Sequence, residues 1–306
     1  MTTQFTKFIA ISLLLIFSHI NFTFADLPAV PVDIDKKTYC VKEPKAWEDH
    51  KQDGLFILID RTSFLENEQR EWIATQIFSE EFAKELRPYT RIQVMFIDNK
   101  SVQEQKLIFD KCRMKTGKKN TEWKEDMYMD NETDLFVHNW NKKFIKDWNA
   151  VNKKVGSRVQ SDYSYVYESI IEVLRNKSFG FNSKNHQNRK IIIVSDLLQN
   201  APKLSFYAAC KAKAKTDGTI NMSKCPSYKN LLNKSEVNKF YVDKLKPREQ
   251  DVENLSVEIL FLNYGQEANE EILPSLIALW ADLFRDMGIK IPEDQREWVQ
   301  MQLRFD

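Results

Sequence analysis

Four short runs rich in apolar residues constrain the fold of this chain more than any other feature of its sequence. They lie at residues 54–60 (GLFILID), 91–98 (RIQVMFID), 189–196 (RKIIIVSD) and 257–263 (VEILFLN). Continuous hydrophobicity, rather than strict alternation with polar residues, is typical of strands that are covered on both faces. A further segment at 103–111 (QEQKLIFDK) predicts a short strand that pairs with the second run as a hairpin.

Segments with helical periodicity alternate with these runs. They lie at 66–86, 135–148, 163–174 and 273–287. Pro88 ends the first of them, and Gly288 stands where a helix C-cap glycine belongs after the last. The alternation predicts an α/β fold, with a single doubly wound, mostly parallel sheet, one short antiparallel edge strand and helices on both faces.

The chain length of 306 residues suits one large domain or two small ones, and no linker in the sequence divides it. We therefore predict one α/β domain over 54–290. An extended lead-in at 26–53 precedes it, and a C-terminal tail at 291–306 follows it. Two polar segments, 114–134 and 210–254, are predicted as loop insertions within this domain.

The overall composition excludes several classes of protein. Lys and Arg number 45 against 44 Asp and Glu, so the chain lacks the excess positive charge that a dedicated nucleic-acid binder uses. Seven Gly and nine Pro are too few for a fibrous chain, and an aromatic content of 12% argues against disorder. We expect a globular protein that does not bind nucleic acid.

The first 25 residues have the order of a secretory signal. Lys7 precedes the apolar run FIAISLLLIF at 8–17, and the small residues Thr23 and Ala25 suit signal cleavage. The alternative is a membrane anchor, but this run is about half of the ~20 residues that a membrane-spanning helix needs. We expect an exported protein, periplasmic or secreted, with no stable membrane span once the signal is removed.

All four cysteines, Cys40, Cys112, Cys210 and Cys225, follow the predicted signal. In an exported chain they predict two disulfides, for which three pairings are possible. We favour Cys210–Cys225, because these residues flank one polar loop, and this choice leaves Cys40 to pair with Cys112. The alternatives are four isolated buried thiols or a zinc site, but the spacings lack the Cys-x-x-Cys pattern of zinc ligands.

Polar side chains gather where the predicted strands end. Asp60, Asp98 and Asp196 each close an apolar run, and Thr62 follows at once after the first. Ser164 lies in a polar turn before the helix that precedes the third run. Ligands of open α/β sheets bind at the carboxyl ends of the strands, and such oxygen donors suit Mg²⁺ or Ca²⁺.

In their order along the chain, three segments resemble the metal-ion-dependent adhesion site of von Willebrand factor A-type (VWA) domains. That fold is shared by integrin inserted domains and many bacterial exported proteins. Its motif has Asp-x-Ser/Thr-x-Ser after the first strand, a later Ser or Thr, and an Asp after the fourth strand. The matching segments here are DRTSF at 60–64, Ser164 in SDYSYVYESI and Asp196 in IVSDLLQN. The resemblance covers roughly residues 50–290 and implies the same mostly parallel sheet.

The resemblance implies an exported module for protein binding or adhesion. The metal would be Mg²⁺, or Mn²⁺ or Ca²⁺, and a carboxylate of the protein partner would complete its coordination. The implied ligands, direct or through water, are Asp60, Thr62, Ser164 and Asp196. Phe64 occupies the last Ser position of the motif, so one direct ligand is missing and the implied site is degenerate. A contact rim is predicted around it, made of Ser63, Tyr163, Tyr165 and Gln199.

Three alternatives remain open from the sequence. In the first alternative, the strand-end aspartates serve only as caps of the following helices. In the second, the chain is a metal-free structural component of an envelope assembly. A cryptic hydrolase is the third alternative. Thr62 stands where a phosphatase of the haloacid dehalogenase type needs its second carboxylate, and no Gly-x-Ser-x-Gly elbow occurs. We therefore expect no catalysis.

Overall fold

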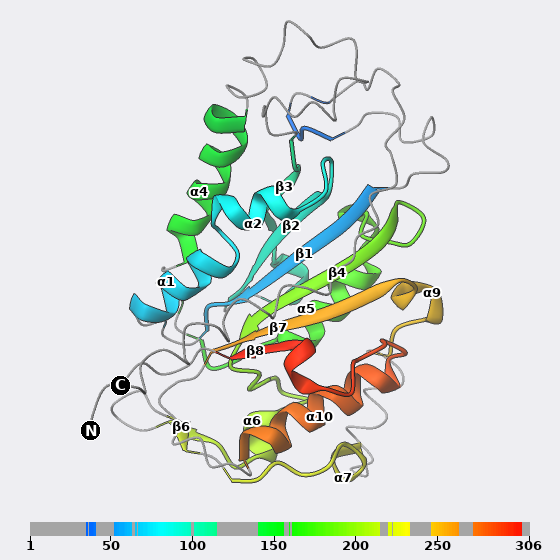
Figure 1. Ribbon diagram of the computed structural model, residues 1–306. Helices are drawn as coiled ribbons and strands as arrows, with labels where there is room; N and C mark the ends of the chain where they lie inside the picture. Colours follow the sequence, from blue (N-terminus) through cyan, green and yellow to red (C-terminus); the bar gives the residue numbers. More distant parts are fainter. Residues whose placement is uncertain are drawn as a thin grey trace, which may run out of the picture.

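A computed structural model of the chain describes residues 35, 37–40, 52–62, 65, 67–98, 101–114, 140–155, 159, 161–214, 220–221, 223–232, 246–262 and 272–301. Among these residues, six strands form one sheet in the order β3-β2-β1-β4-β7-β8 (Figure 1). The strands are β1 (Gln52–Asp60), β2 (Arg91–Ile97), β3 (Leu107–Cys112), β4 (His186–Ser195), β7 (Leu255–Phe261) and β8 (Val299–Met301).

The sheet is mostly parallel, as predicted. β1 runs parallel to both β2 and β4, β7 runs parallel to β4 and β8, and β3 alone pairs antiparallel, with β2. One expectation is wrong: the segment 291–306 is not merely a tail, because Val299–Met301 extends the sheet beyond β7. A strand of three residues is too short to produce an apolar run, so the sequence pattern does not reveal it.

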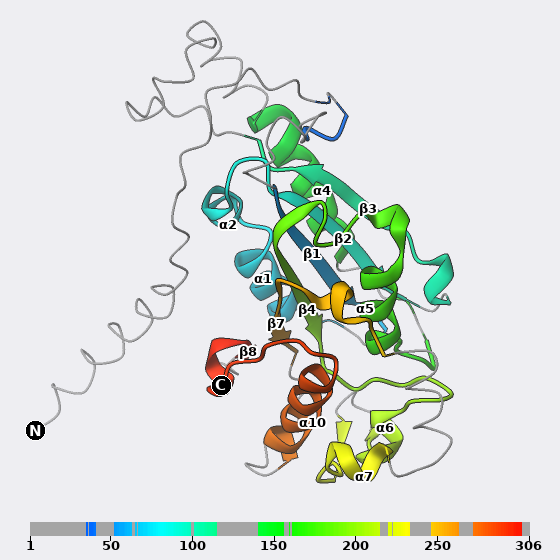
Figure 2. The same ribbon diagram turned by 90° about the vertical axis from the view of Figure 1, so that its right-hand side faces the viewer.

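Helices cover both faces of this sheet (Figures 1 and 2). One face carries α1 (Asn67–Gln76), α2 (Glu80–Glu85), the π-helix η5 (Trp140–Phe144) and α4 (Ile145–Val155). The other face carries α5 (Val166–Arg175) and α10 (Ile272–Asp286). Alternate strand residues supply the two cores, since Phe56 and Leu58 pack toward α5 and α10 while Ile57 packs toward α1 and α4.

The segment 66–86, predicted as one helix, contains two. Ser79 caps α2, because its side chain accepts a hydrogen bond from the Phe82 amide over 3.1 Å. Glu80 and Glu81 follow in the first turn, where negative charge favours a helix start. Hydrophobic spacing continues across the break, because the buried Phe78 packs against Trp148 with 4.8 Å between ring centroids. The apolar pattern continues through the break, so it does not reveal that Ser79 begins a second helix.

The described part of 210–254 carries short elements rather than a plain loop. They are the hairpin of β5 (Lys213–Ala214) with β6 (Ile220–Asn221), α7 (Tyr228–Leu232) and α9 (Glu249–Val252). Both views place α7 and the preceding α6 (Phe206–Ala209) beside α10. Three single-turn 3₁₀ helices complete the description: η3 (Val102–Glu104), η6 (Lys177–Phe179) and η8 (Gln295–Glu297).

Both predicted disulfides are confirmed. Cys210 is bonded to Cys225 and Cys40 to Cys112, with Cα–Cα distances of 4.3 and 4.8 Å. The second bond ties part of the lead-in to β3, where Tyr39 is buried in the core. Within the described ranges, no helix has the length and hydrophobicity needed to cross a membrane. The predicted signal at 1–25 and residues 115–134 of the predicted insertion at 114–134 lie outside the described residues.

Candidate functional site

The position of Asp60 follows from the pleat of β1. Strand side chains alternate between faces, so Asp60 lies on the same face as Phe56 and Leu58, toward α5 and α10. Ser195 ends β4 on that same face, in line with Ile193. Because β1 and β4 are neighbours whose register pairs the two preceding residues, Asp60 and Ser195 lie side by side at the carboxyl edge.

The Asp60 carboxylate accepts four hydrogen bonds. Oδ1 accepts from the backbone N–H of Thr62 (2.9 Å) and from its Oγ1 (2.6 Å). Oδ2 accepts from Oγ of Ser164 (2.8 Å) and from Oγ of Ser195 (3.1 Å). The side chain is buried, and burial of a carboxylate is tolerated when hydrogen bonds replace its water. We call Asp60, Thr62, Ser164 and Ser195 the Asp60 cluster.

Ser164 reaches this cluster through a backbone bridge. Its N–H donates to the carbonyl of Asn200, and the Asn200 N–H donates back to its carbonyl, both over 2.8 Å. The bridge joins the turn before α5 to the loop after β4. The cluster thus collects hydroxyls from three separate segments, including Ser195, which the sequence analysis did not select. The alternation of β4 places Ser195 on the same face as Ile193, whereas the carboxylate that ends the run in the sequence belongs to the next residue, Asp196.

Asp196 has a different environment from Ser195. It is buried, and its Oδ1 accepts a hydrogen bond from the backbone N–H of Leu198 over 2.9 Å. This contact stabilises the turn after β4, in which Leu197 has a positive φ of 61°. The structure therefore brings Asp60, Thr62 and Ser164 together, adds Ser195, and gives the Asp196 carboxylate a role in its own turn.

The predicted contact rim is only partly at the surface. Tyr163 is 45% exposed and Tyr165 is half-buried, with 5.8 Å between their ring centroids. Gln199 was predicted at the rim, but it is buried. Its Oε1 accepts from the Tyr167 amide over 2.8 Å, so it fixes the start of α5 instead of facing a partner. Ser63, together with Phe64 of the motif, lies outside the described residues.

Glu168 in the first turn of α5 lies beside this region. Burial raises the pKa of Glu168 to about 7, although its own backbone N–H and Nε2 of Gln199 both donate to the carboxylate and favour its charged form. Tyr165 adjoins it, and burial likewise raises the pKa of that phenol. The α5 side of the carboxyl edge therefore holds a carboxyl group that titrates near neutral pH.

The donor chemistry of the Asp60 cluster fits a hard divalent cation in part. Each of the three hydroxyls gives its proton to Asp60, which leaves oxygen lone pairs as ligands of the kind that Mg²⁺ prefers. Over the described residues, no group of three or more His, Cys, Asp or Glu side chains is arranged to hold a metal ion. Hydroxyl oxygens backed by one carboxylate would form a weak site.

Comparison with known proteins gives little further guidance. No family model matches the chain, and no curated protein matches it. Among solved structures, the chain is similar to proximal thread matrix protein 1 from the mussel byssus, with 11% sequence identity and a TM-score of 0.29. The match covers 79% of this chain and 49% of that one. The chain thus spans about half of that protein's length, and a likeness this low establishes neither family nor function.

Proposed function

We propose that this chain is an exported, VWA-like protein-binding module whose contact face is the carboxyl edge of the sheet. The observation that carries the proposal is the Asp60 cluster. It gathers hydroxyls from three segments around one strand-end carboxylate, and Asp60, Thr62 and Ser164 are residues that the family resemblance selects. Export is supported by the two disulfides, which persist in oxidising compartments.

In this proposal the cluster is a degenerate metal-ion-dependent adhesion site. The hydroxyl oxygens of Thr62, Ser164 and Ser195 would hold Mg²⁺ or Mn²⁺, while Asp60 orients them and supplies the balancing negative charge. The cation would supply an open coordination position for a carboxylate of the protein partner. Tyr163 at the exposed rim would then contact the partner's surface.

One observation favours a second candidate, a metal-free scaffold of an envelope assembly. Each oxygen of Asp60 already accepts two hydrogen bonds, so the buried carboxylate is satisfied by the protein alone. In that case the cluster ties β1, β4 and the turn before α5 together, and the carboxyl edge serves as a docking surface without a cation.

Calorimetric titration with Mg²⁺ and Mn²⁺ separates the two candidates. The adhesion site predicts saturable binding, and at about 100 times Kd the metal should stabilise the fold by about 2.7 kcal/mol. Ser164→Ala should abolish this stabilisation, whereas the matched control Asp98→Ala, at the end of the neighbouring strand, should retain it. Asp196→Ala tests whether that carboxylate is a ligand, as the family resemblance implies.

A wild-type protein without a metal response would point to the metal-free scaffold. Phe64→Ser then restores the missing hydroxyl of the motif. A response gained by this variant would indicate an eroded adhesion site. If neither protein responds, the adhesion-site proposal fails.

A further inference from the structure

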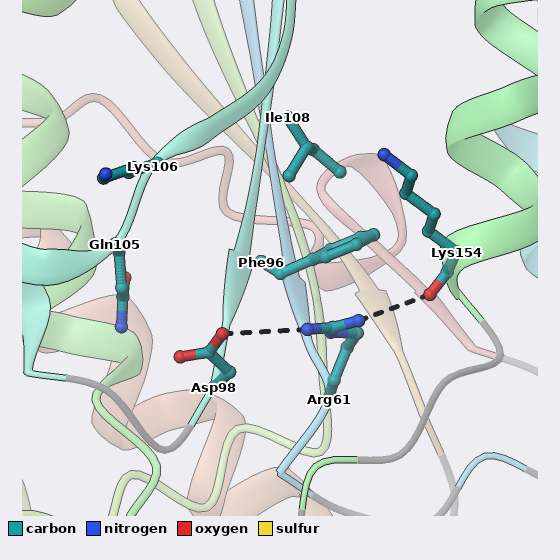
Figure 3. Close-up of a pocket in the computed structure, with 7 residues that line it drawn as sticks. All are labelled: Arg61, Phe96, Asp98, Gln105, Lys106, Ile108 and Lys154. Atoms are coloured by element: carbon teal, nitrogen blue, oxygen red, sulfur yellow. Dashed lines mark hydrogen bonds and ion pairs between the residues drawn. The ribbon is translucent and has the colours of Figure 1, made fainter.

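The carboxyl edge has a second feature on its opposite face. Arg61 directly follows Asp60, so the alternation of the strand turns its side chain toward Phe96 on the α4 side of the sheet. A cavity of about 280 Å³ opens there (Figure 3). We call it the Arg61 pocket, and the side chains that line it include Arg61, Phe96, Gln105, Lys106, Ile108 and Lys154.

We propose that the Arg61 pocket binds a carboxylate group carried on a short apolar stem. The source is either an acidic side chain of a protein partner or a small free carboxylic acid. This site is separate from the Asp60 cluster and needs no metal, so it can hold even if the metal-dependent proposal fails.

The position of Arg61 is set by three contacts. Its Cζ lies 4.0 Å from the centroid of the Phe96 ring, and its Nη2 lies 3.7 Å from Oδ2 of Asp98. Its Nη1 donates to the backbone carbonyl of Lys154 over 3.4 Å. Figure 3 shows the guanidinium between Asp98 and that carbonyl, with the Phe96 ring beside it. A planar guanidinium held in this way suits a planar carboxylate.

The charge of the pocket selects an anion. Among the described residues that line it, Arg61, Lys106 and Lys154 are cationic and Asp98 is the one anionic side chain, so these residues carry 3 − 1 = +2 charges. Both lysines are exposed, one on each side of the cavity, and their positive charges attract an anion. Asp98 disfavours a doubly charged ligand such as phosphate.

A buried donor independently indicates a ligand. Gln105 is 6% exposed, and none of the described residues accepts a hydrogen bond from its Nε2. Its Oε1 is engaged, because it accepts from Oγ of Ser169 over 3.0 Å. A buried donor without an acceptor is unfavourable, so an oxygen of the ligand would supply the hydrogen bond that Nε2 lacks.

The size and walls of the pocket define the rest of the ligand. Phe96 and Ile108 provide apolar surface, which favours a short hydrocarbon stem next to the charged group. At about 280 Å³, the cavity is slightly smaller than most pockets for drug-sized ligands. A single carboxylate with two or three methylenes fits this description better than a nucleotide or a sugar.

The test is an NMR titration of the purified, oxidised protein in buffer freed of divalent cations by a chelating resin. The probes are butyrate, the uncharged analogue butyramide, inorganic phosphate, and the neutral-capped peptide acetyl-Ala-Glu-Ala-amide. We expect saturable shifts of the Gln105 side-chain amide with butyrate or with the peptide, and none with butyramide. Stronger binding of the peptide assigns the site to a protein partner, and stronger binding of butyrate assigns it to a free acid.

Matched variants locate the binding. Lys106→Gln combined with Lys154→Gln should weaken carboxylate binding at least threefold, because the variant removes both exposed positive charges that attract the anion. Lys153→Gln removes the exposed neighbouring charge that does not line the cavity, and it should bind like the wild type. Arg61→Lys keeps the charge but loses the planar fork, so affinity should fall about tenfold or more.

Three results would overturn the proposal. They are the absence of saturable binding by both carboxylates, equal binding of butyramide, and equal affinity of the double lysine variant and the Lys153→Gln control. Tighter binding of phosphate than of butyrate would also overturn it, because the pocket would then select another class of anion. A melting curve for each variant shows that lost binding does not come from unfolding.

Discussion

The Asp60 cluster and the Arg61 pocket begin at adjacent residues of one strand end, yet they have opposite character. Asp60 lies toward α5, is buried and receives four hydrogen bonds. Arg61 lies toward α4 and borders an open cavity with excess positive charge and a buried donor that has no acceptor in the described part of the chain. One step along a pleated backbone is enough to move a side chain from a closed network to an open pocket.

The difference separates two uses of a charged group. A buried carboxylate whose hydrogen bonds are all made holds segments of the chain together, and its removal leaves several donors without partners. A cavity lined by excess positive charge and by a buried amide that has no acceptor among the described residues does not stabilise the fold, and it is available to a ligand. We therefore expect variants of the cluster to change stability and variants of the pocket to change binding.

The largest effect should follow Asp60→Ala. It leaves three hydroxyls and one backbone N–H without their acceptor in a buried site, so the free energy of unfolding should fall by about 3–5 kcal/mol. Asp98→Ala is the matched control, because it removes a carboxylate from the pocket side that is 14% exposed. Its loss should lower stability by about 1 kcal/mol. Urea denaturation measures both, and equal losses would contradict the distinction between the two regions.

Removal of the Cys210–Cys225 disulfide should have the next largest effect. Both cysteines belong to the core cluster on the α5 and α10 face. Their separation of 15 residues corresponds to about 3 kcal/mol in the chain-entropy description, which the double Cys→Ser variant should lose. Butyrate binding at the Arg61 pocket, on the other face, should remain. A parallel loss of binding would show that the two faces are coupled.

The pH dependence of stability should reveal Glu168. Its pKa is raised from the ordinary 4.5 to about 7, so folding favours the protonated form. The resulting stabilisation is complete below pH 4.5 and is lost as the pH rises through 7. Glu168→Gln should therefore gain about 3 kcal/mol relative to the wild type between pH 4.5 and pH 8.

The Glu168 effect is measured as the difference between the two denaturation curves across that pH range. The wild type and Glu168→Gln should bind butyrate equally at pH 8, since Arg61 stays charged. A constant difference in stability would contradict the assigned pKa.

The smallest stability effect should come from Lys106→Gln combined with Lys154→Gln. Both side chains are exposed, so the free energy of unfolding should change by less than about 0.5 kcal/mol. The same variant should lose most of its carboxylate binding. A loss of stability above about 1 kcal/mol would mean that these lysines mainly support the fold.

The sequence predicted the architecture of the sheet better than it predicted which side chains contact one another. Continuous apolar runs located four of the five strands in the parallel part of the sheet, and the spacing of Cys210 and Cys225 indicated their bond. The same reasoning joined α1 to α2, because the hydrophobic spacing runs through the cap at Ser79. It also missed β8, whose pairing with β7 depends on the sheet edge already present rather than on its own three residues.

The sequence by itself determined which residues end buried strands, and therefore which carboxylates reach the carboxyl edge. The tertiary structure decided which side chains meet there. Ser164 and Ser195 lie 104 and 135 residues from Asp60, and only the parallel register of β1 with β4 and the turn before α5 bring them within hydrogen-bond distance. Likewise, the burial of Gln199 and the unmatched amide of Gln105 depend on packing between distant segments. A local pattern of hydrophobicity does not predict such packing.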